Sequence, residues 1–166
     1  RLAVGEALLR LGRNDDALGH MSGALDLIQQ LVASAPNQVF WVETLVRAHS
    51  DLGDLMLNRG EFTTALDHYN QALAGTAKLI GQAPGNLYFQ RDRADALEAI
   101  GRYYVRASTA PGVSAAERSG RRSLARSHFE QSQAIWQDWN KRKLAVPFAT
   151  KRENRVAAHS KNILRG

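Results

Sequence analysis

The amino-acid sequence predicts an all-α fold, a right-handed α-solenoid of three antiparallel helix pairs with a C-terminal capping helix. One observation is the stretch from Leu52 to Ala72, where apolar residues recur every three or four positions on both sides of a turn at Asn58-Arg59-Gly60. The other is that this helix pair recurs along the chain at a period of 48 residues. Because one helix pair cannot bury its apolar face alone, the repeated pairs are expected to stack on one another.

Small residues and core residues of the repeat recur in register. Two helices approach closely only where small side chains lie at the crossing, and Gly5, Gly53 and Gly101 align at this position. Ala17 aligns with Ala65 in the second helices. The third second helix follows at an offset of 60, so that 12 residues are inserted in the third pair. Further aligned pairs are Met21 with Tyr69, Ala24 with Ala72, Leu25 with Leu73, Leu31 with Leu79 and Pro36 with Pro84.

The elements follow in chain order from these patterns. The first helix ends near residue 12, and Asn14-Asp15-Asp16 makes the turn and supplies the acidic N-terminus of the second helix. Pro36 and Pro84 end the second and fourth helices. The expected helices cover about 1–12, the region up to 35, 38–59, 61–83, 86–107, the region up to 143 and 151–164, in repeats of about 1–36, 37–84 and 85–143.

The third pair and the last helix depart from the repeat. Pro111-Gly112 is a strong turn signal, and we expect Ser108–Ser119 to be a mobile loop, although residues 115–122 could extend the next helix. Thr150-Lys151-Arg152-Glu153 has the spacing of a capping box and predicts the start of a capping helix over about 150–165. Its thin apolar side is expected to cover Trp136 and Trp139 at the end of the array, and consists of Val156, Ala157, Ile163 and Leu164. An aromatic binding cage is the alternative for the tryptophans.

The pattern Leu-Gly, followed twelve residues after the glycine by A-x3-Y/F-x2-A, resembles the tetratricopeptide repeat (TPR) over nearly the whole chain. That family repeats at about 34 residues, whereas this unit of 48 residues is longer by roughly four helical turns. Long-helix repeats that end in a segment such as residues 127–139 look like the C-terminal repeat regions of bacterial eukaryotic-like serine/threonine protein kinases. The resemblance implies a protein-binding scaffold, or a regulatory or sensor segment of such a kinase in bacterial signalling.

In the TPR family, the first helix of each pair lines a concave groove that holds a peptide. The Lys/Asn set with which some members clamp a carboxylate is absent here. The alternative is that the charged groove residues neutralise one another between neighbouring repeats, for example Arg47 beside Asp95. The resemblance places the following residues in the groove: Glu6, Leu9, Arg10, Arg47, Ser50, Asp54, Leu57, Asn58, Arg91, Asp95, Glu98, Arg102 and Arg106.

Charge is distributed unevenly along the chain. The net charge is +6, but residues 1–117 hold 10 Lys/Arg against 13 Asp/Glu, and residues 118–166 hold 12 against 3. A basic C-terminal third indicates either a solvated helix face or binding to nucleic acid or another anionic surface. Aromatic residues that could stack on bases are needed by the core, so we favour a protein or peptide partner over nucleic acid.

No residue pattern predicts catalysis or a cofactor. The sequence has no glycine-rich phosphate loop and no nucleophile elbow. Asp51-Leu52-Gly53 superficially resembles a kinase magnesium loop, but its equivalents in the other repeats lose the aspartate. His20, His68 and His128 occupy one repeat position, and neighbouring helices 8–10 Å apart hold them too far from each other to share a metal. We therefore expect a binding protein without metal or cofactor.

The chain starts inside a helix of the repeat, so we expect a fragment of a longer protein. A helix without a preceding neighbour leaves apolar residues uncovered, and self-association through residues 1–35 is expected from Leu2, Leu8, Leu9 and Leu11. No run of 18 apolar residues is present, and membrane insertion is not expected. We expect a cytoplasmic protein, or an extracytoplasmic one if the full-length protein is tethered to a membrane.

Overall fold

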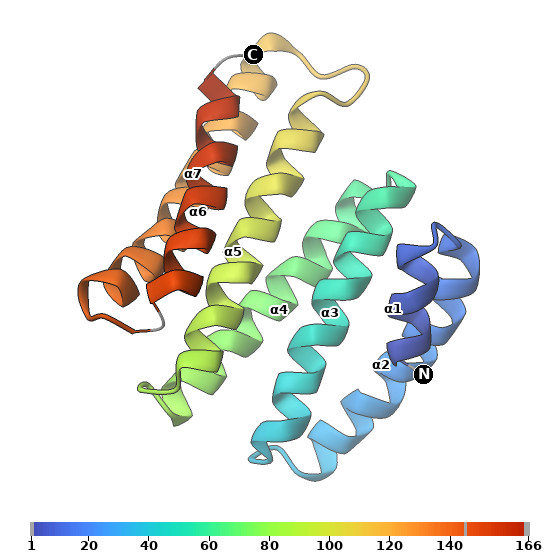
Figure 1. Ribbon diagram of the computed structural model, residues 1–166. Helices are drawn as coiled ribbons and strands as arrows, with labels where there is room; N and C mark the ends of the chain where they lie inside the picture. Colours follow the sequence, from blue (N-terminus) through green and yellow to red (C-terminus); the bar gives the residue numbers. More distant parts are fainter. Residues whose placement is uncertain (1, 145, 165–166) are drawn as a thin grey trace. The chain divides into compact units, whose positions relative to one another are not determined.

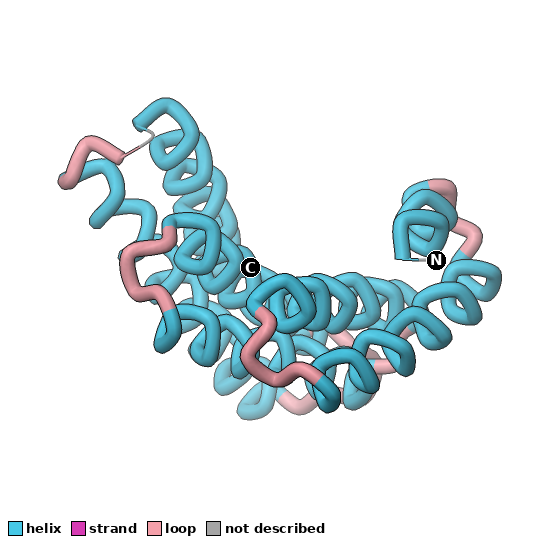
Figure 2. The backbone as a smooth tube through the Cα atoms, turned by 90° about the horizontal axis from the view of Figure 1, so that it is seen from below, coloured by secondary structure: helices cyan, strands magenta, loops and turns pink. Residues whose placement is uncertain are grey.

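The computed structural model describes residues 2–144 and 146–164, and all regular secondary structure in these residues is helical (Figure 1). Figure 2 shows that the loops are confined to the ends of the helices. The all-α prediction is therefore confirmed. The helices are α1 (Leu2–Arg10), α2 (Asn14–Ser34), α3 (Val39–Arg59), α4 (Phe62–Gln82), α5 (Leu87–Ser108), α6 (Ala115–Lys141) and α7 (Val146–Leu164).

The turns inside the first two helix pairs are tighter than expected. Helix α3 continues through Asn58 and Arg59, and Gly60 ends it in the left-handed conformation with φ of 80°. The next helix begins at Phe62, so the turn consists of Gly60 and Glu61 alone. In the first pair, Gly12 has φ of 74° and provides the same reversal, because glycine adopts positive φ without steric cost. The predicted turn at residues 14–16 is wrong: these residues form the first turn of α2.

The insertion in the third pair is mostly helix. Helix α6 begins at Ala115, so the expected loop over Ser108–Ser119 is wrong beyond residue 114. The cause is a capping box that the sequence reading missed. The Glu117 backbone N–H donates to the Ser114 hydroxyl at 3.2 Å, and the Ser114 N–H donates to the Glu117 carboxylate at 2.9 Å. The insertion therefore lengthens α6 rather than forming a long loop.

The last helix starts earlier than predicted. Helix α7 begins at Val146, and Pro147 lies in its first turn, where a missing N–H breaks no helical hydrogen bond. Thr150 is therefore inside the helix and does not cap it. Its hydroxyl donates to the Asn140 side-chain oxygen at 3.0 Å. Val156 is fully buried and Ala157 half-buried, whereas the side chains of Ile163 and Leu164 lie outside the described part of the chain.

The chain divides into two compact units, Arg1–Phe89 and Gln90–Gly166, and each is described by itself. Unit 1 contains α1 to α4, and its helices pack in the order of the chain, α1 on α2, α2 on α3 and α3 on α4. Unit 2 contains most of α5 with α6 and α7, and α7 packs on α6. Adjacent helices are thus packed in both units, as the repeat pattern predicts.

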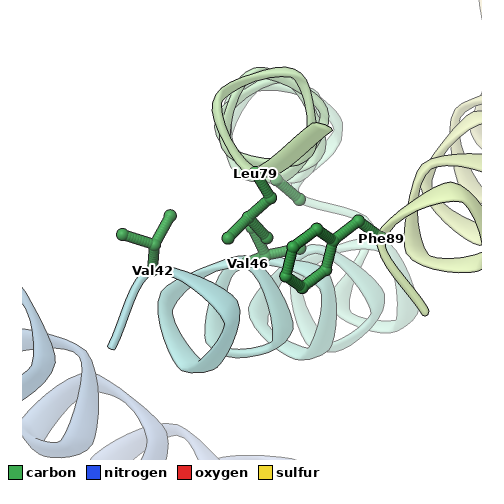
Figure 3. Packing of buried hydrophobic residues seen from close by; sticks show 5 residues of the cluster. Val42, Val46, Leu79 and Phe89 are labelled. Carbon is green, nitrogen blue, oxygen red and sulfur yellow. The ribbon is translucent and has the colours of Figure 1, made fainter. Parts of the chain in front are cut away.

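The core of unit 1 is built around the small residues of the repeat. A Cβ atom at Gly53 would lie 2.5 Å from the Tyr69 ring, and one at Gly5 would lie 2.5 Å from the Met21 side chain. Both large side chains are buried, with exposed fractions of 1% and 0%. Glycine therefore allows α4 to contact α3, and α2 to contact α1, at the repeat positions. Figure 3 shows a second layer of this core, formed by Val42, Val46, Ala72, Leu79 and Phe89.

The core of unit 2 repeats this arrangement and adds two tryptophans. A Cβ atom at Gly101 would lie 2.5 Å from the Phe129 ring. Trp136 is fully buried and its ring lies 5.7 Å from that of Phe148 in α7. Trp139 is also buried, and its indole N–H donates to the Gln90 side chain at 2.8 Å. The tryptophans therefore belong to the core that α7 covers, and they do not form an open aromatic cage.

The N-terminal edge of unit 1 is only partly covered. Leu2 is buried, Leu8 and Leu9 are half-buried, and Leu11 is 73% exposed. The four leucines are thus not all covered, in agreement with the sequence argument. Self-association through residues 1–35 stays a prediction.

Candidate functional site

The predicted groove residues of unit 1 are polar side chains that already have intramolecular partners. Arg47 lies 3.7 Å from Glu6 as an ion pair between α3 and α1. The Ser50 hydroxyl donates to the Val46 carbonyl at 3.0 Å, and Asp54 accepts a hydrogen bond of 2.6 Å from the Tyr69 hydroxyl. The exposed side chains in this set are Arg10, Arg47 and Asn58, whereas Glu6, Leu9, Ser50 and Asp54 are half-buried and Leu57 is buried.

A carboxyl pair lies next to these residues. Burial raises the pKa of Asp51 from its ordinary 3.8 to about 7, and the neighbouring carboxylates of Glu6 and Asp54 raise it further, while Arg47 opposes them. One carboxyl oxygen of Asp51 is buried without a hydrogen-bond partner. The sequence reading compared this aspartate with a kinase magnesium loop and assigned it to the repeat. Its burial beside Glu6 is a property that only the packing of α1 on α3 creates.

Two histidines meet between α3 and α4. The Nδ1 atoms of His49 and His68 are 3.0 Å apart, a distance at which one ring nitrogen donates and the other accepts. His49 is buried, and burial together with the charge of His68 lowers its pKa to about 4. The sequence aligned His68 with His20 and His128 but did not pair it with His49. The pair therefore forms within one repeat and not between equivalent positions.

A recess of about 250 Å³ opens beside His49 in unit 1. Its walls come from α2, α3 and α4 and are mostly aliphatic, with three polar side chains. The lining residues are Val32, Val42, Leu45, Val46, His49, Gln71, Ala74, Gly75 and Lys78. Lys78 is exposed and donates to the Pro36 carbonyl at 3.1 Å, so the cation of this recess is already held at a helix end.

The predicted groove residues of unit 2 lie on α5, and two of them are acidic. Glu98 is 1% exposed, which is rare for a carboxylate without partners. It lies 3.4 Å from Arg102, also contacts Arg155 and faces the His159 ring nitrogen at 3.5 Å. The guanidinium of Arg91 pairs with Asp92 at 2.7 Å. Both Arg102 and Arg106 are exposed.

Helix α7 supplies the cations that meet these carboxylates. Arg152 lies 3.2 Å and Arg155 3.5 Å from Asp95. Burial raises the pKa of Asp95, while the two arginines act in the opposite direction. We call Asp95, Glu98, Arg152 and Arg155 the α5–α7 ionic cluster. It ties the last helix to α5 on the side where the groove was predicted.

A pocket of about 230 Å³ lies next to the ionic cluster, between α5, α6 and α7. The Phe129 ring and Val105 form apolar walls, and the His159 ring lies 5.5 Å from the Phe129 ring. The remaining lining residues are polar or cationic. We call this recess the α7 pocket, and its lining consists of Arg102, Val105, Arg106, Phe129, His159 and Asn162.

The sequence reading found two of the pocket residues and missed those of the last helix. Arg102 and Arg106 were predicted as groove residues from their register on α5. In α7, Arg152, Arg155, His159 and Asn162 recur every three or four residues and therefore share one face of a helix. That periodicity was a usable signal, but the sequence reading treated the basic C-terminal third as one region and α7 only as a cap.

Part of the positive charge of the C-terminal third is used internally. Arg121 donates to the Ala107 carbonyl at 2.6 Å, and Arg142 pairs with Asp138 at 3.0 Å. Together with the pairs of Arg152 and Arg155, these contacts occupy four of the basic side chains. In the described part of the chain, no three histidine or acidic side chains are placed to hold a metal ion.

Comparison of the chain with protein-family models, with curated proteins and with solved structures gave no match. No helix among residues 2–144 and 146–164 combines the length and the apolar character needed to cross a membrane.

Proposed function

We propose that the chain is a non-enzymatic interaction scaffold of the TPR type that binds a peptide or protein partner. In this proposal, the helix pairs stack as a right-handed solenoid, and α1, α3 and α5 line its concave face. The repeat of small residues at Gly5, Gly53 and Gly101, each opposite a large buried side chain, supports stacking of like units.

The observation that carries the binding role is the α7 pocket. Two arginines that the groove prediction names, Arg102 and Arg106, are exposed one helical turn apart beside apolar walls. Protein-recognition surfaces combine arginine with aromatic and apolar contacts in this way, because the apolar part excludes water while the guanidinium provides directed hydrogen bonds. A volume of about 230 Å³ is below the 300–1,000 Å³ typical of pockets for drug-sized ligands, which favours a single side chain over a cofactor.

The experiment is a selection from a random peptide library, followed by titration of the selected peptides in solution. We expect Arg47→Glu combined with Arg106→Glu to weaken binding at least tenfold, because both exposed cations lie on predicted groove helices. Lys151→Glu is the matched control, since it makes the same charge change at an exposed position of α7. An unchanged affinity in the groove variant would reject the proposed face.

The competing function, binding of nucleic acid by the basic third, is tested in the same series. Generic duplex DNA should bind weakly, and peptide affinity should depend little on salt. DNA binding that falls linearly with the logarithm of the salt concentration, and that Arg122→Glu removes, would replace the peptide proposal.

A further inference from the structure

The charges around the α7 pocket do not balance. The two carboxylates of Asp95 and Glu98 pair with three guanidinium groups, those of Arg102, Arg152 and Arg155. Arg106 on the pocket rim adds a further cation. Each carboxylate is thus shared by more than one arginine, and the cluster with its rim carries more positive than negative charge. An anion that enters the pocket is therefore attracted electrostatically.

The walls of the pocket select for more than charge. Phe129 and Val105 present apolar surface, and His159 lies against the Phe129 ring. A free inorganic anion would lose water on these walls without gaining a contact. An apolar cavity of about 150 Å³ accommodates a benzene ring. The volume of about 230 Å³ therefore suits a phenyl-sized group with a short charged end.

Donors lie at the rim, where the charged end of such a ligand would be. Arg102 and Arg106 offer guanidinium N–H groups that match the oxygens of carboxylate or phosphate, and Asn162 carries an amide donor. These donors come from α5 and α7, whereas the apolar wall comes from α5 and α6. The docking of α7 on the other two helices completes the site.

We propose that the α7 pocket binds an amphipathic anion, that is, an apolar group about the size of a phenyl ring that carries a carboxylate or phosphate. The apolar group contacts Phe129 and Val105, and the anion accepts hydrogen bonds from Arg102, Arg106 and Asn162. Only the identity of the partner rests on the proposed function: there, the group is a side chain or terminus of the bound peptide.

The test uses three small probes and NMR chemical shifts of the whole chain. The probes are 3-phenylpropionate, phenyl phosphate and the neutral 3-phenylpropionamide. We expect the two anions to shift resonances of Phe129 and His159 with millimolar affinity and the amide to cause at least tenfold weaker effects. Whichever anion binds more tightly identifies the preferred charged group. Equal binding of the amide, or no shift with either anion, overturns the inference.

A pair of variants assigns the binding to the pocket. Arg106→Gln should weaken binding of both anions about five- to tenfold, because it removes one charge-assisted hydrogen bond. Lys151→Gln removes the same charge from an exposed position of α7 and should leave the affinity unchanged. An affinity that Arg106→Gln leaves unchanged, or that Lys151→Gln lowers equally, also overturns the inference.

The same variants separate the inference from the proposed function. Binding of 3-phenylpropionate without any selected peptide would support the pocket and reject the peptide scaffold. Selected peptides that bind wild type and Arg106→Gln alike, together with a pocket that ignores both anions, would support the scaffold and reject the inference.

Discussion

The α3–α4 pair of unit 1 and the α5–α6 pair of unit 2 use the same crossing but different side chains beside it. In unit 1, the Tyr69 ring lies over Gly53 and its hydroxyl donates to Asp54. In unit 2, the Phe129 ring lies over Gly101 and has no hydroxyl. The position equivalent to Asp54 is Arg102, which pairs instead with Glu98 and lines the α7 pocket.

This comparison shows how one repeat position can serve packing in one place and recognition in another. A tyrosine paired with a carboxylate satisfies its own polar atoms and leaves no donor for a ligand. A phenylalanine next to an arginine provides an apolar wall and a cation side by side. The substitutions at two positions of a common framework therefore distinguish a closed crossing from a pocket.

The largest effect is expected from breaking the α5–α7 ionic cluster. Glu98→Gln removes a buried carboxylate from Arg102 and Arg155, and should lower the free energy of unfolding of unit 2 by about 3 kcal/mol. Hydrogen exchange should show loss of protection first in α7, with unit 1 unchanged. Glu130→Gln, at an exposed position of α6, is the matched control. Equal effects of the two variants would contradict the role of the cluster.

The shared crossing is tested by adding a methyl group to each glycine. Gly53→Ala and Gly101→Ala should each destabilise the fold by about 1–3 kcal/mol, because the new Cβ meets a buried aromatic ring. Gly5→Ala should cost less, since the flexible Met21 side chain can move away. Gly19→Ala, with open space around it on α2, should stabilise by roughly 0.5–1 kcal/mol. Thermal unfolding measures all four, and a neutral Gly101→Ala would disprove the close crossing in unit 2.

The two units should also differ in their response to pH. Asp51 in unit 1 has a pKa raised to about 7, so the folded state binds more protons than the unfolded state between about pH 4 and 7. This site therefore loses stability as the pH rises through that window. Asp51→Asn removes the loss, and above pH 7 the variant should exceed wild type by on the order of 1–2 kcal/mol.

His49 acts in the opposite direction and sets the control for this measurement. Its pKa is lowered to about 4, so the unfolded state binds the extra proton and stability falls as the pH drops from 6.5 towards 4. Because the two effects oppose each other in wild type, denaturant unfolding of Asp51→Asn should show a steeper rise of stability with pH. A difference between variant and wild type that does not change with pH would show that Asp51 is ionised normally.

The smallest effect concerns the hydroxyl that distinguishes the two crossings. Tyr69→Phe should cost about 1 kcal/mol, the typical net worth of one hydrogen bond, because Asp54 loses its donor. Phe129→Tyr should bring no comparable gain, since the guanidinium of Arg102 offers no acceptor for the new hydroxyl. Equilibrium unfolding of both variants checks this asymmetry, and a stabilised Phe129→Tyr would refute it.

The sequence predicted the helices well because their signals are local. The register of Gly5, Gly53 and Gly101 identified the crossings, and each glycine faces the large side chain that the repeat aligns with it. The boundaries that failed are also explained locally. The capping box at Ser114 was present in the sequence but was overlooked, and Pro147 was read as a link although a first helical turn tolerates proline.

The site was predicted only in part, because its members come from different elements. Register placed Arg102 and Arg106 on α5, and both line the pocket. The face that α7 presents to α5 cannot be read from periodicity alone, since a helix with few apolar residues can dock in several orientations. The pairing of Arg155 with Glu98 follows from the docking that buries Val156 and covers Trp136.

By itself, the sequence determined that the chain forms helix pairs, where they cross and which residues share a helix face, because three- and four-residue periodicity and small residues act within or between neighbouring helices. Only the tertiary structure decided that Glu98 is buried among arginines, that His49 meets His68 and that Arg102 borders a pocket. Those outcomes depend on how side chains distant in sequence share space and charge, and no local pattern encodes that sharing.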